Sequence, residues 1–192
     1  GARRRARSRA RPRAVGSFGA RDVASDASVR TFAATVTGSL DVLINNAGVR
    51  GRADDLPGLD LEDAARIFQV NALGSLRVTR ALLPLLRRAQ GKIVSISSNM
   101  ASIAENAQGG SYGYRMSKAA LNMATCSLAQ DLAAEGIIAV VLSPGWVQTD
   151  MGGPAAPPPV AESAAGMIAV IDRLTPADSG SFLDYRSRRL PW

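Results

Sequence analysis

Three short and almost continuously apolar runs mark this chain: LDVLIN (40–45), KIVSIS (92–97) and IIAVVLS (137–143). Long segments with helical spacing of apolar residues separate the runs. Uninterrupted apolar runs are typical of strands that are buried on both faces, whereas half-exposed strands alternate apolar and polar residues. An alternation of such strands with helices builds a parallel sheet that helices cover on both sides. We therefore expect a doubly wound, Rossmann-like α/β fold.

Capping residues, glycines and prolines set the expected boundaries of the other elements. The expected helices cover about 26–37, a long stretch from Asp60 to 88 that Pro84 kinks, 112–135 and 160–174. A weak strand is expected at 15–23, a proline-rich loop at 144–159, and a short strand at 181–185.

The net positive charge of the chain is concentrated in its N-terminal residues. Residues 1–14 hold seven arginines and no acidic residue, which accounts for the whole net charge of +7. We expect a basic disordered tail over 1–14 in front of one domain over 15–192. The tail could contact nucleic acid or an acidic membrane surface, act as a targeting peptide, or have no function. The neutral body, and a tail without aromatic residues among its arginines, argue against a nucleic-acid-binding protein.

Several other classes of protein are excluded by composition. No apolar run approaches the ~18 residues that span a bilayer, and no signal-peptide core follows the basic start. The chain has no histidine and a single cysteine, Cys126, so we expect no metal site and no internal disulfide. We expect a cytoplasmic protein.

The pair with the clearest chemical meaning is Tyr114 and Lys118 in YRMSK. Residues four apart on a helix share one face. A neighbouring ammonium favours the phenolate and lowers the tyrosine pKa from its usual ~10, which would suit Tyr114 to proton transfer. Only two of the 23 basic residues are lysines, Lys92 and Lys118, so a lysine at this spacing is notable in a chain that otherwise uses arginine.

Polar segments follow each expected strand. NNAG (45–48) follows the first run, the serines of SISS (95–98) end the second, and PGWVQT (144–149) follows the third. Asn71 lies within the long expected helix. Ligands of open α/β sheets bind outside the carboxyl ends of the strands, and we expect all these segments to fall there. Each segment alone could be a turn or a cap, but together and in this order they indicate a binding site.

In this order the segments resemble the short-chain dehydrogenase/reductase family, and within it the C-factor/sniffer-like carbonyl reductases. The resemblance covers about residues 20–192. It is carried by DVLINNAG, the Asn71 helix, IVSISSNMASIAENAQGGSYGYRMSKAALN, LSPGWVQTDMGGP and SGSFLDYRSRRLPW.

The resemblance implies roles for the catalytic residues. Tyr114 would donate a proton to a substrate carbonyl, and Lys118 would lower the tyrosine pKa and hold the nicotinamide ribose. Ser98 would hydrogen-bond the carbonyl oxygen; Ser102 is the alternative, because the spacing from Ser98 to Tyr114 is longer than is usual in the family. Asn71 would hold a water that relays protons through Lys118.

The resemblance also implies a cofactor, NADP or NAD, whose choice the sequence leaves open. The residues implied to contact it are Asp22, Val23, Asn46, Ala47, Gly48, Tyr114, Lys118, Val147 and Thr149. Residues 151–159 would form part of a lid over a small carbonyl substrate. The family's helix pairing implies a homodimer through helices 61–88 and 112–135.

One family feature is missing from the sequence. The glycine-rich turn TGxxxGxG, whose backbone amides hold the cofactor pyrophosphate, has no match, and VGSFG (15–19) is a poor substitute because no strand can precede it. We therefore expect an N-terminally truncated domain with an unprotected apolar edge at 40–45. Two functions remain open: a reductase, or a non-catalytic family member that acts as a binding or signalling partner.

Overall fold

The computed structural model describes residues 22–52 and 54–192. The described residues form one parallel sheet with strand order β1-β2-β3-β4, so that neighbours in the sheet are also neighbours along the chain. The strands are β1 (Val42–Asn45), β2 (Lys92–Ile96), β3 (Ile138–Ser143) and β4 (Phe182–Asp184). The three apolar runs and the short terminal strand are therefore strands, as predicted, although each is one or two residues shorter than its predicted range.

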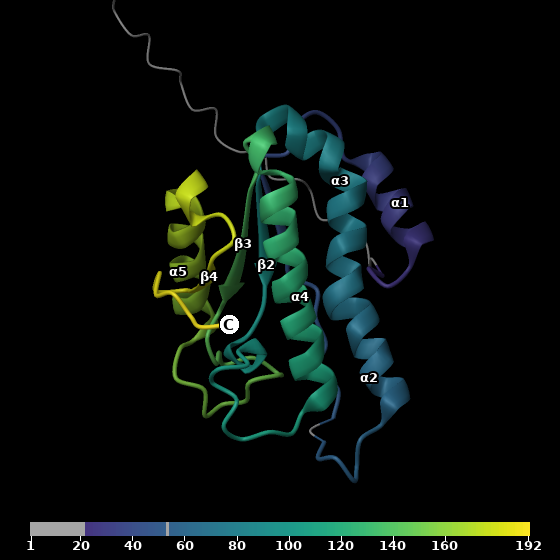
Figure 1. The fold of residues 1–192 in the computed structure, drawn as a ribbon, viewed down its shortest axis with the longest axis vertical. Helices are drawn as coiled ribbons and strands as arrows, with labels where there is room; N and C mark the ends of the chain where they lie inside the picture. The colour runs from purple at the N-terminus through teal and green to yellow at the C-terminus, as the bar shows by residue number, and fades with distance from the viewer. Residues whose placement is uncertain (1–21, 53) are drawn as a thin grey trace, which may run out of the picture.

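Helices lie on both faces of the sheet (Figure 1). The helices are α1 (Asp26–Thr35), α2 (Leu61–Phe68), α3 (Ser75–Ala89), α4 (Tyr112–Asp131) and α5 (Val160–Arg173). One apolar cluster joins the sheet to α3 and α4, through residues such as Leu86, Ile93 and Ala129. The other joins it to α5, through residues such as Val140 and Val170. The doubly wound fold expected from the sequence is confirmed.

The long helix predicted from Asp60 is interrupted, but not where the sequence suggested. Asp60 caps α2 by accepting from the backbone amides of Glu62 and Asp63. A π-helical turn, Gln69–Gly74, then separates α2 from α3. Pro84 lies inside α3, which continues through it to Ala89. The departure from regular α-helix therefore surrounds Asn71, at a position where π-turns often mark functional sites.

The strand that was expected to have an exposed edge, β1, is partly open to solvent. Ile44 is 48% exposed, whereas Leu43 on the other face is buried against the helices. β1 pairs with β2 only, among the residues that the structure describes. The predictions for the tail over 1–14 and for VGSFG at 15–19 fall outside the described residues.

No helix in the described ranges has the length and apolar character needed to cross a membrane. The predicted locations of the helices agree with the structure to within a few residues. For example, α1 is capped by Ser25 and ends at Thr35, two residues before the predicted end.

Candidate active site

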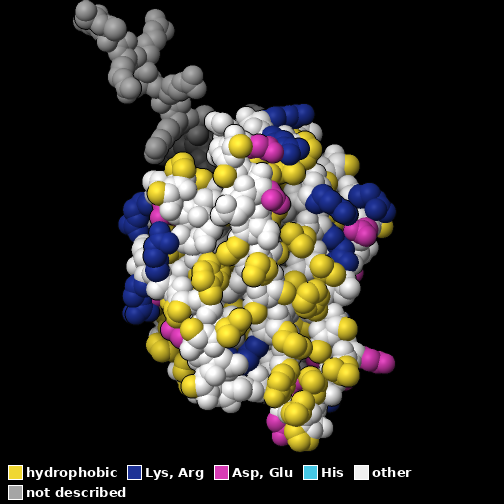
Figure 2. Space-filling model, in the orientation of Figure 1, with side chains coloured by type: hydrophobic (Ala, Val, Ile, Leu, Met, Phe, Trp, Pro, Cys, Tyr) yellow, Lys and Arg dark blue, Asp and Glu magenta, His cyan; other side chains and the backbone are white. Residues whose placement is uncertain are grey.

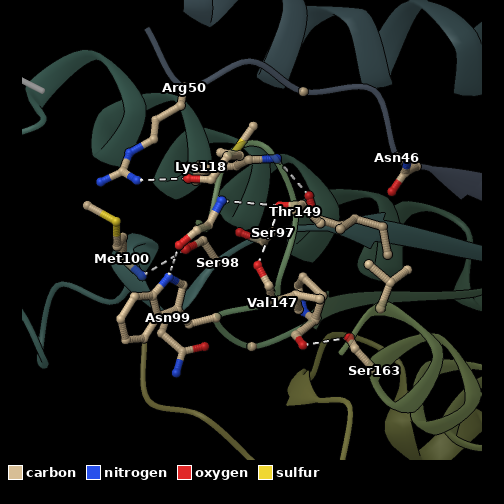
Figure 3. Close-up of a pocket in the computed structure, with 18 of the residues that line it drawn as sticks. Asn46, Arg50, Ser97, Ser98, Asn99, Met100, Lys118, Val147, Thr149 and Ser163 are labelled. Carbon is tan, nitrogen blue, oxygen red and sulfur yellow. Dashed lines mark hydrogen bonds between the residues drawn. The ribbon is translucent and has the colours of Figure 1, made fainter. Parts of the chain in front are cut away.

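A cavity of about 850 Å³ opens at the carboxyl ends of the strands (Figure 3). Its walls come from the segments that follow β1, β2 and β3, together with one face of α4 and the start of α5. The sequence predicted this location, because all three segments carry the polar motifs. The predicted site residues that line the cavity are Asn46, Gly48, Ser98, Tyr114, Lys118, Val147 and Thr149.

Tyr114 is nearly buried in this wall. Burial raises the pKa of its phenol, and the hydrogen bond with Ser98 and the positive charge of Arg50 oppose that rise only in part. The expectation that the tyrosine pKa is lowered is therefore wrong for this structure. The physical reason is that desolvation of the charged phenolate outweighs the favourable interactions. The phenol therefore holds its proton at neutral pH.

Lys118 lies one helical turn beyond Tyr114, and its Nζ is 6.0 Å from the centre of the tyrosine ring. The ammonium donates a hydrogen bond of 2.8 Å to the carbonyl oxygen of Ile96 at the end of β2. Burial lowers the lysine pKa to about 8. The groups that oppose the rise in the tyrosine pKa are Ser98 and Arg50 rather than Lys118, so the direct coupling expected from the spacing is not seen.

The structure separates the two candidate serines. Ser98 lines the cavity, interacts with Tyr114, and accepts from the backbone amide of Met100 at 3.2 Å. Ser102 is buried away from the cavity lining, where it donates to the carbonyl oxygen of Trp192 and accepts from the amide of Glu105. The geometry therefore favours Ser98 as the serine that faces a substrate.

Asn71 is completely buried and does not line the cavity. Its side-chain amide bonds to both backbone groups of Val49, each at 2.8 Å, and donates to Ser117 Oγ at 2.9 Å. These bonds fix the loop that follows β1 onto helix α4. The structure thus gives the Asn71 side chain a positioning role, and the proton relay implied by the family resemblance remains a prediction.

The predicted cofactor contacts fall into two neighbouring hollows. Val23, Asn46 and Ala47 line a second, smaller cavity of about 240 Å³ beside β1. Asn46 lines both cavities and so connects them. Asp22 lines neither: its carboxylate accepts from the amide of Ala24, which is a local turn contact.

The predicted lid is held by its own hydrogen bonds. The indole of Trp146 donates to the carbonyl oxygen of Gly152 at 2.7 Å, and the side chain of Gln148 donates to that of Ala156 at 2.9 Å. Met151 and Gly152 line the cavity, whereas the prolines at 154–159 do not. The lid prediction is therefore supported for its first two residues.

Sequence reasoning missed several residues of the cavity wall, including three whose side chains form hydrogen bonds there. Arg50 reaches the lid by donating to the carbonyl oxygen of Met151 at 3.3 Å. Asn99 accepts from Ser143 Oγ at 2.6 Å, and Ser163 donates to the carbonyl oxygen of Pro144 at 2.7 Å. Arg50 could have been found, because it lies two residues after NNAG; Asn99 and Ser163 carry no signal that separates them from other polar loop and helix residues.

The part of the cavity wall beside Lys118 and Gly48 fits a nucleotide sugar. Lys118 has three N–H donors, and its hydrogen bond to the carbonyl oxygen of Ile96 uses one of them. A Cβ added to Gly48 would lie 3.3 Å from the Lys118 Nζ and 3.4 Å from the Asn71 Oδ1, so glycine keeps the space beside the ammonium open. An ammonium at an open wall suits the hydroxyls of a ribose. In the described ranges no group of three or more metal-ligating side chains occurs.

Comparison with known proteins identifies the family of the chain and agrees with the fold. Residues 10–158 match the sequence profile described as short chain dehydrogenase. The chain belongs to the short-chain dehydrogenase/reductase family.

Individual relatives lie in the branch that the motifs indicated. The chain is 54% identical over 166 residues to C-signal of Myxococcus xanthus, a match that covers 85% of this chain and 100% of the relative. The carbonyl reductase Sniffer of D. melanogaster superposes with a TM-score of 0.86 at 34% identity, over 89% of this chain and 76% of that one. An NADPH-bound carbonyl reductase from chicken fatty liver gives a TM-score of 0.85 at 34% identity, over 90% and 75% of the two chains.

Proposed function

We propose that this protein reduces small carbonyl compounds with NADPH or NADH, and that Tyr114 supplies the proton. The observation that carries the proposal is the meeting of Ser98, Tyr114 and Lys118 at one wall of an 850 Å³ cavity at the carboxyl ends of the strands. Two similar proteins of known structure are carbonyl reductases, and one of them is described as NADPH-bound. Family membership supports oxidoreductase chemistry of this type.

The roles follow from the geometry. Ser98 and Tyr114 present two hydroxyls to one carbonyl oxygen, which holds that oxygen and polarises the carbonyl bond. When bound, a reduced nicotinamide supplies the hydride, so the carbonyl carbon gains two electrons. Tyr114 gives its proton to the carbonyl oxygen, and the product is an alcohol. The buried phenol keeps its proton at neutral pH, because desolvation raises its pKa.

The remaining wall residues bind the cofactor in this proposal. Lys118 holds the nicotinamide ribose through the two donors that Ile96 leaves. Val147 and Thr149 would lie beside the nicotinamide, and Gly48 would lie beside the ribose that Lys118 holds. Asn46, Ala47 and Val23 would lie along the adenosine. Asp22 has the weakest support, because its carboxylate is engaged in a local turn. The choice between NADP and NAD stays open.

A matched pair of tyrosine variants tests the proposal. Tyr114→Phe removes the hydroxyl that donates the proton, and turnover of an aldehyde panel with NADPH and NADH should fall by about 10²–10⁴-fold. Tyr112→Phe, two residues earlier in α4 and outside the cavity lining, is the control and should retain activity. Cofactor affinity, measured by calorimetry, should be similar in both variants. Equal rates for the Tyr114→Phe and wild-type proteins would remove Tyr114 from the mechanism.

A second candidate is a non-catalytic or signalling role that depends on pairing between chains. It is favoured by the match to C-signal, which extends over the whole of that protein. Apolar side chains also gather on the face formed by α2 and α4 (Figure 2), where Leu61, Phe68, Met116 and Met123 are exposed. Such a face suits a homodimer, in which the same helices of two copies pack together.

Sedimentation tests the dimer independently of catalysis. Met123→Glu places a charge in the middle of this face and should convert a dimer to monomers. Ile168→Glu, on the exposed face of α5, is the control and should leave the sedimentation coefficient unchanged. A monomeric wild-type protein at micromolar concentration would contradict the dimer and weaken the second candidate.

A further inference from the structure

Arg50 is a charged residue of the cavity wall that none of the roles above uses. It follows the NNAG segment at the end of β1, and its guanidinium is half-buried beside the lid. A guanidinium stays charged at any physiological pH and presents five donors in a planar fork. The structure therefore holds a permanent cation at the substrate cavity.

The contacts of Arg50 leave much of this donor capacity unused. Among the described residues, it donates one hydrogen bond, to the carbonyl oxygen of Met151. No ion pair links it to a carboxylate within residues 22–52 and 54–192. Arg115, a basic residue of α4 outside the cavity lining, differs, because its Nε and Nη1 donate to the carbonyl oxygens of Gly110 and Met100.

The position of Arg50 points to the substrate rather than to the cofactor. Figure 3 shows Arg50 and Met100 toward one end of the cavity and Asn46 at the opposite end. Asn46 connects to the smaller cavity beside β1, which is assigned above to the adenosine. Arg50 is also close enough to Tyr114 for its charge to act on the phenol. A group bound by Arg50 would thus lie near the reacting carbonyl and far from the adenosine.

The charges of the wall suit an anion at this end. The charged lining residues are Arg50, Lys118 and Asp150. Lys118 is engaged with Ile96 at the base of the site, and Asp150 is exposed on the lid. A carboxylate can accept two parallel N–H bonds from a guanidinium, a geometry that gives both strength and orientation.

We propose that Arg50 binds a carboxylate of the substrate, so that the protein prefers carbonyl compounds that carry a carboxylate over neutral ones. The inference rests on the proposed reductase function for the identity of the reacting group. Arg50 would be a specificity-determining residue: it fixes the far end of the substrate, and its bond to Met151 couples that recognition to the position of the lid.

A pair of aldehydes that differ in charge tests the inference. The probes are 4-formylbenzoate and its neutral methyl ester, and the readout is the ratio of their kcat/KM values. The wild-type protein should prefer the acid, and Arg50→Met should reduce that preference by about 10- to 100-fold, as expected for loss of a charge-assisted hydrogen bond. Arg50→Lys keeps the charge without the planar fork and should retain part of the preference.

The control variant is Arg173→Met, which removes an exposed arginine at the end of α5, bonded to Ser187. It should leave the ratio unchanged. Equal kcat/KM values for acid and ester in the wild-type protein, or a ratio that Arg50→Met does not alter, would overturn the inference. A parallel loss of NADPH affinity in Arg50→Met would assign Arg50 to the cofactor and would overturn it as well.

Binding measurements decide the inference if neither aldehyde is turned over. In that case the reductase proposal fails, and calorimetric titration of the wild-type and Arg50→Met proteins with the two aldehydes replaces the rates. Tighter binding of the acid that Arg50→Met abolishes would support an anion site at Arg50. Equal binding of acid and ester would refute it.

Discussion

Replacement of Lys118 by methionine is expected to stabilise the folded protein at neutral pH, although the same change should abolish activity under the proposed function. Lys118 is buried, and burial lowers its pKa from 10.5 to about 8. When folding lowers the pKa of a basic group, the folded state bears a free-energy cost for keeping that group charged. Methionine has a similar length and no charge, so Lys118→Met removes that cost.

The magnitude follows from the pKa values. The fall from 10.5 to about 8 corresponds to roughly 3 kcal/mol of destabilisation at pH 7, at about 1.4 kcal/mol for each pKa unit. The variant also leaves the carbonyl oxygen of Ile96 without its partner, which costs about 1–2 kcal/mol. The net expectation at pH 7 is a gain of roughly 1–2 kcal/mol for Lys118→Met.

The pH dependence gives this prediction its distinctive form. The pKa of Lys118 is lower in the folded state than in the unfolded state. Between pH 8 and 10.5, Lys118 therefore binds a proton in the unfolded wild-type chain but not in the folded one. Wild-type stability therefore rises with pH through this window, relative to the variant. Above about pH 9 to 10 the order should reverse, because only the lost bond to Ile96 then separates the two proteins.

Urea unfolding of both proteins at several pH values from 6.5 to 10 measures the difference. Lys92→Met is the control, because Lys92 is the other lysine of the chain and donates to the carbonyl oxygens of Ile171 and Asp172 at the end of α5. It should destabilise the protein at pH 7, opposite in sign to Lys118→Met. A Lys118→Met protein that is less stable than wild type by the same amount at every pH would refute the reasoning.

Four further substitutions separate structural from catalytic roles. Ser98→Ala should lower kcat with little change in stability, whereas Ser102→Ala should spare kcat and lower stability by about 1 kcal/mol; activity and urea unfolding distinguish them. Asn71→Ala should destabilise the fold by about 2–4 kcal/mol in urea unfolding, since the Asn71 side chain is fully buried and makes three hydrogen bonds. Gly152→Ala should displace the lid and shift the fluorescence of Trp146, because a Cβ there would clash with the backbone carbonyl oxygen of Val147.

The elements of the fold were predictable because their signals are local. Continuous apolar runs gave the strands, and capping residues such as Ser25 and Asp60 gave the helix starts. The π-helical turn at 69–74 was not predictable in this way. It adds one residue to a helical turn, and the apolar spacing of the long segment does not record where that residue is added.

The candidate site was predictable in outline and not in its energetics. The strand-end motifs fixed which segments meet, because parallel strands bring their carboxyl ends to one edge. The raised pKa of Tyr114 was missed, since it depends on how deeply the wall packs around the phenol. The separation of Ser98 from Ser102 depends on the short 3-10 turn Asn99–Ala101, which turns the chain away from the cavity.

The sheet beneath the site carries a layer of polar side chains that is costly for stability. Ser95 is hydrogen-bonded to Thr125, and Ser97 is hydrogen-bonded to Asn122. In contrast, the two residues of β2 between Lys92 and Ser95 are both apolar. In the described residues the buried Nδ2 of Asn122 has no hydrogen-bond partner. An apolar layer would be at least as stable, because an unpaired buried donor costs about 1–3 kcal/mol.

This layer bears on the choice between the two functions. Lys118, bonded to the carbonyl oxygen of Ile96, adds a buried ammonium to the same layer, at the cost estimated above. Groups that lower stability persist where they hold reacting atoms in place, since rigid polar networks preorganise a site. A protein whose task is to present α2 and α4 to a partner needs none of them. The polar layer therefore favours the reductase over the purely signalling role.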